Sequence, residues 1–254
     1  MNILQTATTK LGNKIELIGE ASENNILVIG VFHGDEPQGK YLIERYLEQF
    51  SPSPFPLVSE ELGRGANQYS LAHLDSAEHK LPVDVCARGG EGRGANNLLL
   101  IPCLNPDGMQ NNTRTNANGV DLNRNFPTKN WGEDTSAAGD NPQDYYGGKS
   151  AGSEIETQFV IDIIEKYQPK LILTLHAPYK IVNYDGPAQD IAQKVSDIIG
   201  YPVEPSIGYP TPGSFGTYCG VERNIPTITL ELDEKIPVET LEQPVFEIFD
   251  MLQN

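Results

Sequence analysis

The stretch Leu27-Val28-Ile29-Gly30-Val31-Phe32-His33-Gly34-Asp35-Glu36 passes from an unbroken apolar run into a polar loop. Continuous apolar runs are typical of strands that are covered on both faces of a sheet. A helical pattern follows from about Gln38 to Phe50. His33 and Glu36 therefore stand just after a predicted buried strand at 26–31, and imidazole nitrogen and carboxylate oxygen both suit zinc. Such a pair also occurs by chance, so the hypothesis needs a third ligand elsewhere.

Three further buried strands are predicted at residues 98–104, 171–176 and 227–231, and an edge strand at 14–18 precedes the first. Helices are predicted at 153–167, opened by a Ser153–Glu156 capping box, at 187–199 with Gly200 as C-cap, and at 237–252. This alternation predicts an α/β fold with three layers: a mixed, mainly parallel central sheet with helices on both faces. We expect a single domain over residues 1–254.

Residues 51–97 are the least regular part of the chain. The segment opens with a proline-rich run at 51–56, closes with a glycine-rich run at 89–94, and has room for a helix at 67–81. We interpret it as an insertion that runs over the surface, and the alternative is a functional lid.

Composition narrows the possible partners. The 254 residues include 18 basic and 35 acidic side chains, which give a net charge of −17. This charge favours solubility and argues against nucleic acid and anionic membranes, since both require a positive face. No secretory signal pattern is found, and no apolar run approaches the roughly 20 residues that cross a bilayer. Cys86, Cys103 and Cys219 lack C-x-x-C spacing, which favours reduced thiols and a cytoplasmic location.

The polar ends of the predicted strands suggest one shared site. The carboxyl ends of parallel strands lie along one sheet edge, where α/β proteins bind ligands. His176 could there complete a site begun by His33 and Glu36, although a histidine at a strand end is often structural. Two nitrogens and one carboxylate form the shell of a catalytic zinc and leave a fourth position for water. The apolar run before Glu231 would desolvate its carboxylate, as suits a general base.

A second concentration of polar residues lies at 114–127, Arg-Thr-Asn-Ala-Asn-Gly-Val-Asp-Leu-Asn-Arg-Asn-Phe-Pro. Composition alone would fit a solvated loop with an Asn-Gly turn. Arg114 and Arg124 nevertheless lie within eleven positions of each other in a chain that has few basic residues. Because guanidinium groups bind carboxylates bidentately, the segment is also a candidate anion clamp that could offset the acidic background.

Taken in order, these motifs resemble the zinc carboxypeptidase family of the carboxypeptidase A type. The resemblance covers residues 26–232 and includes His33-x-x-Glu36, Asn-Pro-Asp-Gly at 105–108, the run at 114–127, His176 and Glu231. The runs at 114–127 and 208–216 are similar to those of the murein tripeptide amidases within that family. The resemblance implies a zinc carboxypeptidase-like catalytic domain.

The family's metal site would be carried here by four residues. His33, Glu36 and His176 would hold one zinc ion per chain. Asp121 would accept a hydrogen bond from the ring of His33 and fix its orientation.

The family's catalytic and substrate-binding roles would fall on five others. Glu231 would be the general base and would return its proton to the leaving amine, while Arg114 would stabilise the oxyanion. Asn123 and Arg124 would bind the terminal carboxylate of the released residue. Tyr209 would close over the substrate.

The resemblance thus implies a metallopeptidase that cleaves the γ-D-Glu–meso-diaminopimelate bond of the murein tripeptide L-Ala-γ-D-Glu-meso-diaminopimelate, as in peptidoglycan recycling. The alternatives are an N-acyl amino acid deacylase of the succinylglutamate desuccinylase or aspartoacylase kind, a general carboxypeptidase, and a metal-free binding protein. One departure is Ala177-Pro178, where pancreatic members have a non-proline cis peptide. Because proline lowers the cost of the cis form to about 0.5–1 kcal/mol, we predict a cis Ala177–Pro178 bond.

Overall fold

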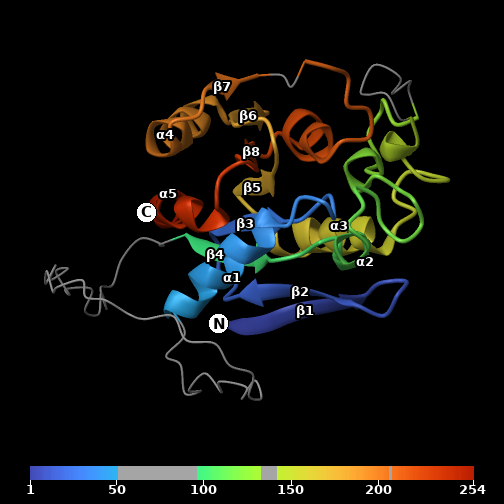
Figure 1. Ribbon diagram of the computed structural model, residues 1–254, viewed down its shortest axis with the longest axis horizontal. Helices are drawn as coiled ribbons and strands as arrows, with labels where there is room; N and C mark the ends of the chain where they lie inside the picture. Colours follow the sequence, from blue (N-terminus) through green and yellow to red (C-terminus); the bar gives the residue numbers. More distant parts are fainter. Residues whose placement is uncertain (51–95, 133–141, 206–207) are drawn as a thin grey trace, which may run out of the picture. The chain divides into compact units, whose positions relative to one another are not determined.

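The computed structural model describes residues 1–50, 96–132, 142–205 and 208–254. These residues build one mixed sheet of eight strands in the order β1-β2-β4-β3-β5-β8-β6-β7 (Figure 1). The strands are β1 (Asn2–Thr8), β2 (Lys14–Gly19), β3 (Asn25–Gly30), β4 (Asn97–Ile101), β5 (Leu171–His176), β6 (Ile181–Asp185), β7 (Val203–Glu204) and β8 (Thr227–Glu231).

The centre of the sheet is parallel, as predicted. β3 pairs in parallel with β4 and β5, and β5 pairs in parallel with β8. The unbroken apolar sequence of β3 follows from this position, because its alternate residues enter two different cores. Ile26 and Val28 point into one core, and Leu27 and Ile29 into the other.

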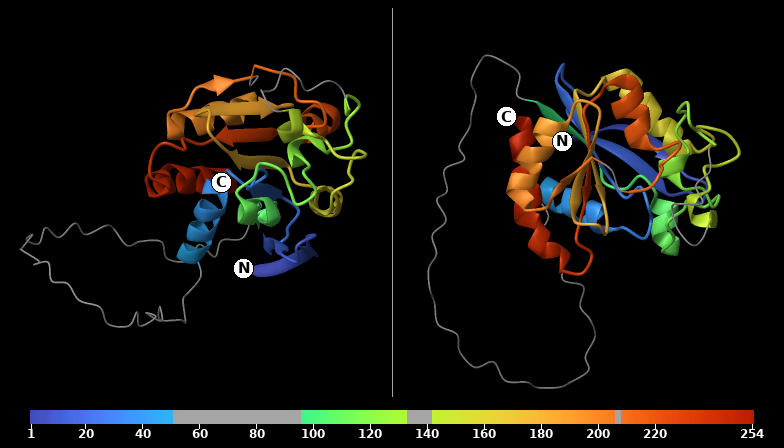
Figure 2. Two further views of the ribbon diagram at one scale, coloured as in Figure 1. Left: turned by 45° about the vertical axis from the view of Figure 1, so that its right-hand side comes forward. Right: turned by 90° about the horizontal axis from the view of Figure 1, so that it is seen from above.

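Helices cover both faces of the sheet (Figure 2). Apolar side chains of α1 (Gln38–Phe50), α4 (Gln189–Ile199) and α5 (Glu242–Gln253) pack on one face, and those of α3 (Ile155–Tyr167) pack on the other. The three-layer α/β prediction is therefore confirmed. The other helical elements among the described residues are α2 (Pro106–Asn111) and the short turns η1 (Leu122–Arg124), η3 (Pro142–Tyr145), η4 (Thr217–Val221) and η5 (Val238–Leu241).

Two details of the predicted helices have different outcomes. Gly200 has a φ of +78° and caps the C-terminus of α4, as expected. The prediction of a capping box before α3 is wrong. Glu154 is the N-cap residue without a side-chain cap, and the Ser153 hydroxyl instead donates to its Oε1 at 2.6 Å. The reason is competition, because Asn125 donates to Ser153 and Asn116 donates to Glu156, the two residues that would form the box.

The edge of the sheet also differs from the prediction. The strand expected at the edge, β2, pairs with β4 on one side and with β1 on the other. β1, β6 and β7 were not predicted, because β1 and β6 mix polar and apolar residues and β7 has only two residues. The described residues all belong to one compact unit. The expected insertion at 51–97, with its possible helix at 67–81, lies outside the described residues except for Asn96 and Asn97, and Asn97 already begins β4.

A close backbone contact holds the loop after β3. The Gly34 N–H donates to the Arg114 carbonyl at 3.3 Å, and a methyl group on Gly34 would overlap the backbone of Gly108 and Met109. This contact fixes the loop that carries His33.

Gly34→Ala should therefore destabilise the protein. We expect a loss of about 1–3 kcal/mol, the usual cost of overpacking, measured as a lower urea midpoint at unchanged m-value. Gly12→Ala is the matched control, because nothing lies within 4 Å of the added methyl group. Only its φ of +90° is strained, at a cost of about 1 kcal/mol. An equal loss of unfolding free energy in the two variants would show that the backbone around Gly34 can accommodate the added methyl group.

Candidate active site

The candidate ligands lie at the ends of two neighbouring parallel strands. His33 and Glu36 follow β3, and His176 is the last residue of β5. Val31 turns the chain out of β3 with a φ of +55°, which is unusual for a branched residue. The segment after β4 supports this turn, because the Asn105 N–H donates to the Val31 carbonyl at 3.0 Å.

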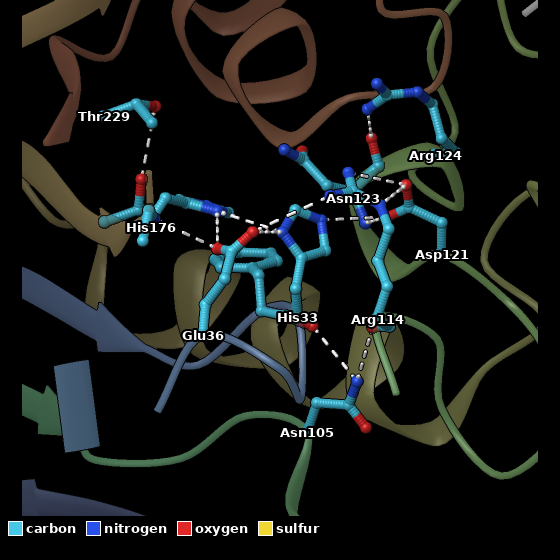
Figure 3. Close-up of polar contacts among 12 residues, drawn as sticks. His33, Glu36, Asn105, Arg114, Asp121, Asn123, Arg124, His176 and Thr229 are labelled. Carbon is cyan, nitrogen blue, oxygen red and sulfur yellow. Dashed lines mark hydrogen bonds and ion pairs between the residues drawn. The ribbon is translucent and has the colours of Figure 1, made fainter. Parts of the chain in front are cut away.

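His33, Glu36 and His176 point toward one another (Figure 3). Glu36 Oε1 lies 2.8 Å from His33 Nδ1, and Glu36 Oε2 lies 3.0 Å from His176 Nδ1. The two Nδ1 atoms are 3.3 Å apart, and one ligand atom from each residue lies within 4.8 Å of the others. Two imidazole lone pairs at this distance repel unless a proton or a cation lies between them. The donor set thus fits a zinc ion.

Asp121 connects the ligands to Arg114. Its Oδ1 lies 3.2 Å from His33 Nε2, and its Oδ2 accepts from Arg114 Nε at 3.1 Å and Nη2 at 3.0 Å. Burial opposes ionisation of Asp121, but Arg114 and His33 outweigh it and hold the pKa of the carboxyl well below its usual range. A carboxylate at Nε2 favours the tautomer whose Nδ1 lone pair faces Glu36 and His176.

Glu231 stands beside the third ligand because β5 and β8 run in parallel. The strand register pairs it directly with His176. Its carboxylate is buried, and Oε2 has no hydrogen-bond partner in the part of the chain that the structure describes. Burial raises the pKa of this carboxyl. A buried carboxylate with one unpartnered oxygen can accept a proton from a bound water.

Arg124 is almost fully buried although it is a cation. Its Nη1 donates to the Asn123 carbonyl at 2.6 Å, whereas Nε and Nη2 have no partner among the described residues. Asn123 Oδ1 accepts from the Phe215 N–H at 2.8 Å. Because buried donors are costly when they lack an acceptor, this arrangement fits a ligand carboxylate.

One cleft of about 240 Å³ collects these side chains. All the residues predicted from the sequence line it except Asp121, which lies behind His33 and Arg114. They are His33, Glu36, Arg114, Asn123, Arg124, His176, Tyr209 and Glu231. The Ala177–Pro178 bond at the cleft is cis, as predicted.

Sequence reasoning missed Tyr145 at this site. Its ring centroid lies 5.0 Å from Arg114 Cζ and 5.6 Å from Arg124 Cζ. An aromatic ring that contacts two guanidinium groups stabilises the positive charge of both by cation–π attraction. No motif marks Tyr145 in the sequence, since it follows a segment without regular hydrophobic spacing.

Zinc affinity should fall as the pH falls. Burial and Arg114 oppose protonation of His33, but the carboxylates of Glu36 and Asp121 outweigh them, and the pKa of His33 is raised. The metal-free protein therefore keeps a proton that zinc must displace. We expect the apparent zinc affinity to weaken about tenfold per pH unit below that pKa, measured by competition with a chromophoric chelator. Affinity that does not change with pH would contradict protonation of a ligand.

Comparison with known proteins places this chain among peptidases. Residues 95–201 match the family described as zinc carboxypeptidase. Murein peptide amidase A of Escherichia coli K12 is 36% identical over 227 residues, which cover 87% of this chain and 90% of that protein. Murein peptide amidase A of Vibrio campbellii is 34% identical over 197 residues, which cover 75% of this chain and 74% of that protein.

Solved structures agree with these matches. Murein-tripeptide amidase MpaA from Escherichia coli O157 has a TM-score of 0.69 at 25% identity, covering 97% of this chain and 90% of that one. Carboxypeptidase A from Helicoverpa armigera has a TM-score of 0.64 at 16% identity, covering 99% of this chain and 68% of that one. This second likeness shows the fold alone. None of the helices in the described residues could cross a membrane, judged by length and apolar content.

Proposed function

The chain belongs to the zinc carboxypeptidase family, and from this premise we propose that it hydrolyses the γ-D-Glu–meso-diaminopimelate bond of the murein tripeptide. The observation that carries the reaction type is the single cleft that holds a three-ligand metal set, a buried carboxylate and a buried guanidinium group. The murein substrate is supported by the 36% identity with murein peptide amidase A over 90% of that protein.

His33, Glu36 and His176 would hold one zinc ion per chain. When bound, zinc supplies a Lewis acid that makes a water more acidic and polarises the scissile carbonyl. Asp121 orients the His33 ring through the Nε2 contact at 3.2 Å. This contact ties the metal site to the anion-binding side of the cleft, because the same carboxylate holds Arg114.

Five residues would act on the substrate and the attacking water. Glu231 takes a proton from the water and passes it to the leaving amine. Arg114 stabilises the negative charge that develops on the carbonyl oxygen. Arg124 and Asn123 bind the terminal carboxylate, which positions the scissile bond. Tyr209 lines the cleft and would cover the bound peptide.

We also propose a cytoplasmic location. Cys103 and Cys219 are buried and unpaired, which supports a reducing compartment.

The direct test is mass spectrometry of the tripeptide after incubation with enzyme that is first stripped of metal and then reloaded with zinc. We expect free meso-diaminopimelate and L-Ala-γ-D-Glu with zinc, and neither product without it. Two comparison substrates identify other activities: an N-succinyl or N-acetyl acidic amino acid tests for a deacylase, and an ordinary α-linked peptide tests for a general carboxypeptidase. Faster zinc-dependent turnover of either one than of the tripeptide would contradict the proposal.

A further inference from the structure

The ring of Tyr145 joins the two arginines of the cleft. Its centroid lies 5.0 Å from Arg114 Cζ and 5.6 Å from Arg124 Cζ. Both arginines line the cleft, whereas Tyr145 contacts them without being one of the residues that form its wall. The proposed mechanism gives each arginine its own task on the substrate and leaves the ring that they share without a role.

The two guanidinium groups are held in different ways. Arg114 donates its Nε and Nη2 to the Asp121 carboxylate at 3.1 and 3.0 Å. Arg124 donates its Nη1 to the Asn123 carbonyl, and its Nε and Nη2 have no hydrogen-bond partner in the part of the chain that the structure describes. Because Arg124 is only 2% exposed and cation–π attraction strengthens when the cation is desolvated, the ring matters most for Arg124.

The chain that follows Tyr145 is anchored to the same framework as the two arginines. The carbonyl of Tyr146 accepts from the N–H of Asp121, the residue whose carboxylate holds the first arginine, at 2.9 Å. A methyl group on Gly147 would come within 2.6 Å of the Arg124 carbonyl oxygen, so the two backbones lie in close contact. The ring therefore has a fixed place from which it can set the spacing of the guanidinium groups.

This spacing has to match the substrate. The scissile carbonyl and the terminal carboxylate are separated only by the amide nitrogen and one α-carbon, so the distance between the two developing or resident negative charges varies little. Arg114 has to reach the first and Arg124 the second at the same time. A guanidinium group that also samples other positions lowers the competent fraction of the enzyme, and the apparent affinity falls by that fraction.

We propose that Tyr145 is a positioning residue whose ring face presets the spacing of the Arg114 and Arg124 guanidinium groups before the substrate binds. The inference rests on the proposed function for the tasks of the two arginines, and it adds the residue that ties them together. The contact is made with the ring, so the property that counts is the negative potential of the ring face rather than the hydroxyl group.

The test changes this potential while it keeps the shape of the ring. Tyr145→Phe is compared with variants that carry monofluoro-, trifluoro- and pentafluorophenylalanine at the same position, because fluorine withdraws negative charge from the ring face. For the zinc-loaded enzymes we expect kcat/KM on the tripeptide to fall stepwise with each addition of fluorine. The whole series should span about 2- to 30-fold, the range of cation–π contacts from exposed to desolvated.

Tyr167 offers a matched control with the same chemistry. Its ring lies 4.8 Å from Lys166 Nζ, and its carbonyl accepts from Asn25, the first residue of β3. Tyr167 therefore lies at the amino edge of the sheet, opposite to the cleft. The same fluorinated series at this position should leave kcat/KM unchanged.

A measurement without substrate separates the inference from the proposed function. In nuclear magnetic resonance spectra of zinc-loaded protein with isotope-labelled arginine, the Nε–H signal of Arg124 should be sharp in Tyr145→Phe. It should broaden in the pentafluoro variant, because a guanidinium group that is held less firmly exchanges between positions.

A fluorine series at Tyr145 that leaves kcat/KM unchanged would overturn the positioning role while the proposed function stands. A loss that is already complete in Tyr145→Phe would overturn it too, since the hydroxyl group would then carry the effect. If the wild type did not cleave the tripeptide, the proposed function would fail and the Arg124 signal would decide. Broadening in the pentafluoro variant would then support the inference, and an unchanged signal would refute it.

Discussion

Glu231→Gln should lower kcat by about 10²- to 10⁴-fold, the usual contribution of a general base, while KM and bound zinc stay close to wild type. Glutamine keeps the size and the hydrogen-bonding oxygen of Glu231 but cannot accept the proton. The position suits such a base because the side chain is buried, lies opposite His176 in the strand register and has an unpartnered oxygen. Steady-state kinetics on the tripeptide, with metal content measured on the same sample, checks the result.

The pH profile gives this prediction a second readout. Burial raises the pKa of Glu231, and only the ionised form can take a proton. Wild-type activity should therefore fall as the pH drops through that raised pKa, and the residual activity of Glu231→Gln should lack this limb. Glu234→Gln removes an exposed carboxylate from the mouth of the same cleft and should retain wild-type turnover. A Glu231→Gln enzyme with wild-type kcat would exclude the carboxylate as the base.

Arg124→Ala should lower kcat/KM by about 10²- to 10³-fold, because it removes up to two charge-assisted hydrogen bonds to the terminal carboxylate. The buried Nε and Nη2 atoms of Arg124 have no hydrogen-bond partner among the described residues, and Arg124 lines the cleft. A bound carboxylate would supply the missing acceptors. Arg124→Lys keeps the charge but loses the planar fork, so an intermediate loss is expected.

A double-mutant cycle isolates this contact. Amidation of the tripeptide's terminal carboxylate should cost the wild type about as much as Arg124→Ala does, and the two changes together should cost little more than either alone. Fully additive losses would show that Arg124 acts elsewhere, for example by supporting the Asn123 carbonyl to which it donates.

Part of the candidate site could be predicted because several of its residues lie at or just after the ends of strands with clear apolar patterns. β3 and β5 are unbroken apolar runs in the middle of a parallel sheet, so the positions of His33 and His176 follow from topology. β6 carries no comparable signal, since Ile-Val-Asn-Tyr-Asp mixes polar and apolar residues on a strand near the sheet's end. The strand β6 therefore escaped prediction.

Contacts between loops could not be predicted from the sequence either. The Ser153–Glu156 capping pattern failed because Asn125 and Asn116, distant in sequence, hold the residues that would form it. Tyr145 contacts Arg114 because the chain around residues 142–146 passes close to it, which no local pattern indicates. Such side-chain networks depend on tertiary placement, which local propensity does not encode.

We propose above all that His33, Glu36 and His176 together hold a zinc ion at the carboxyl edge of the sheet. X-ray absorption of the zinc-loaded protein, compared with His176→Ala, tests it most directly. We predict two imidazole ligands in the wild type, one in the variant, and a loss of zinc affinity in the variant. Two imidazoles in both proteins, or equal zinc affinity, would contradict the account.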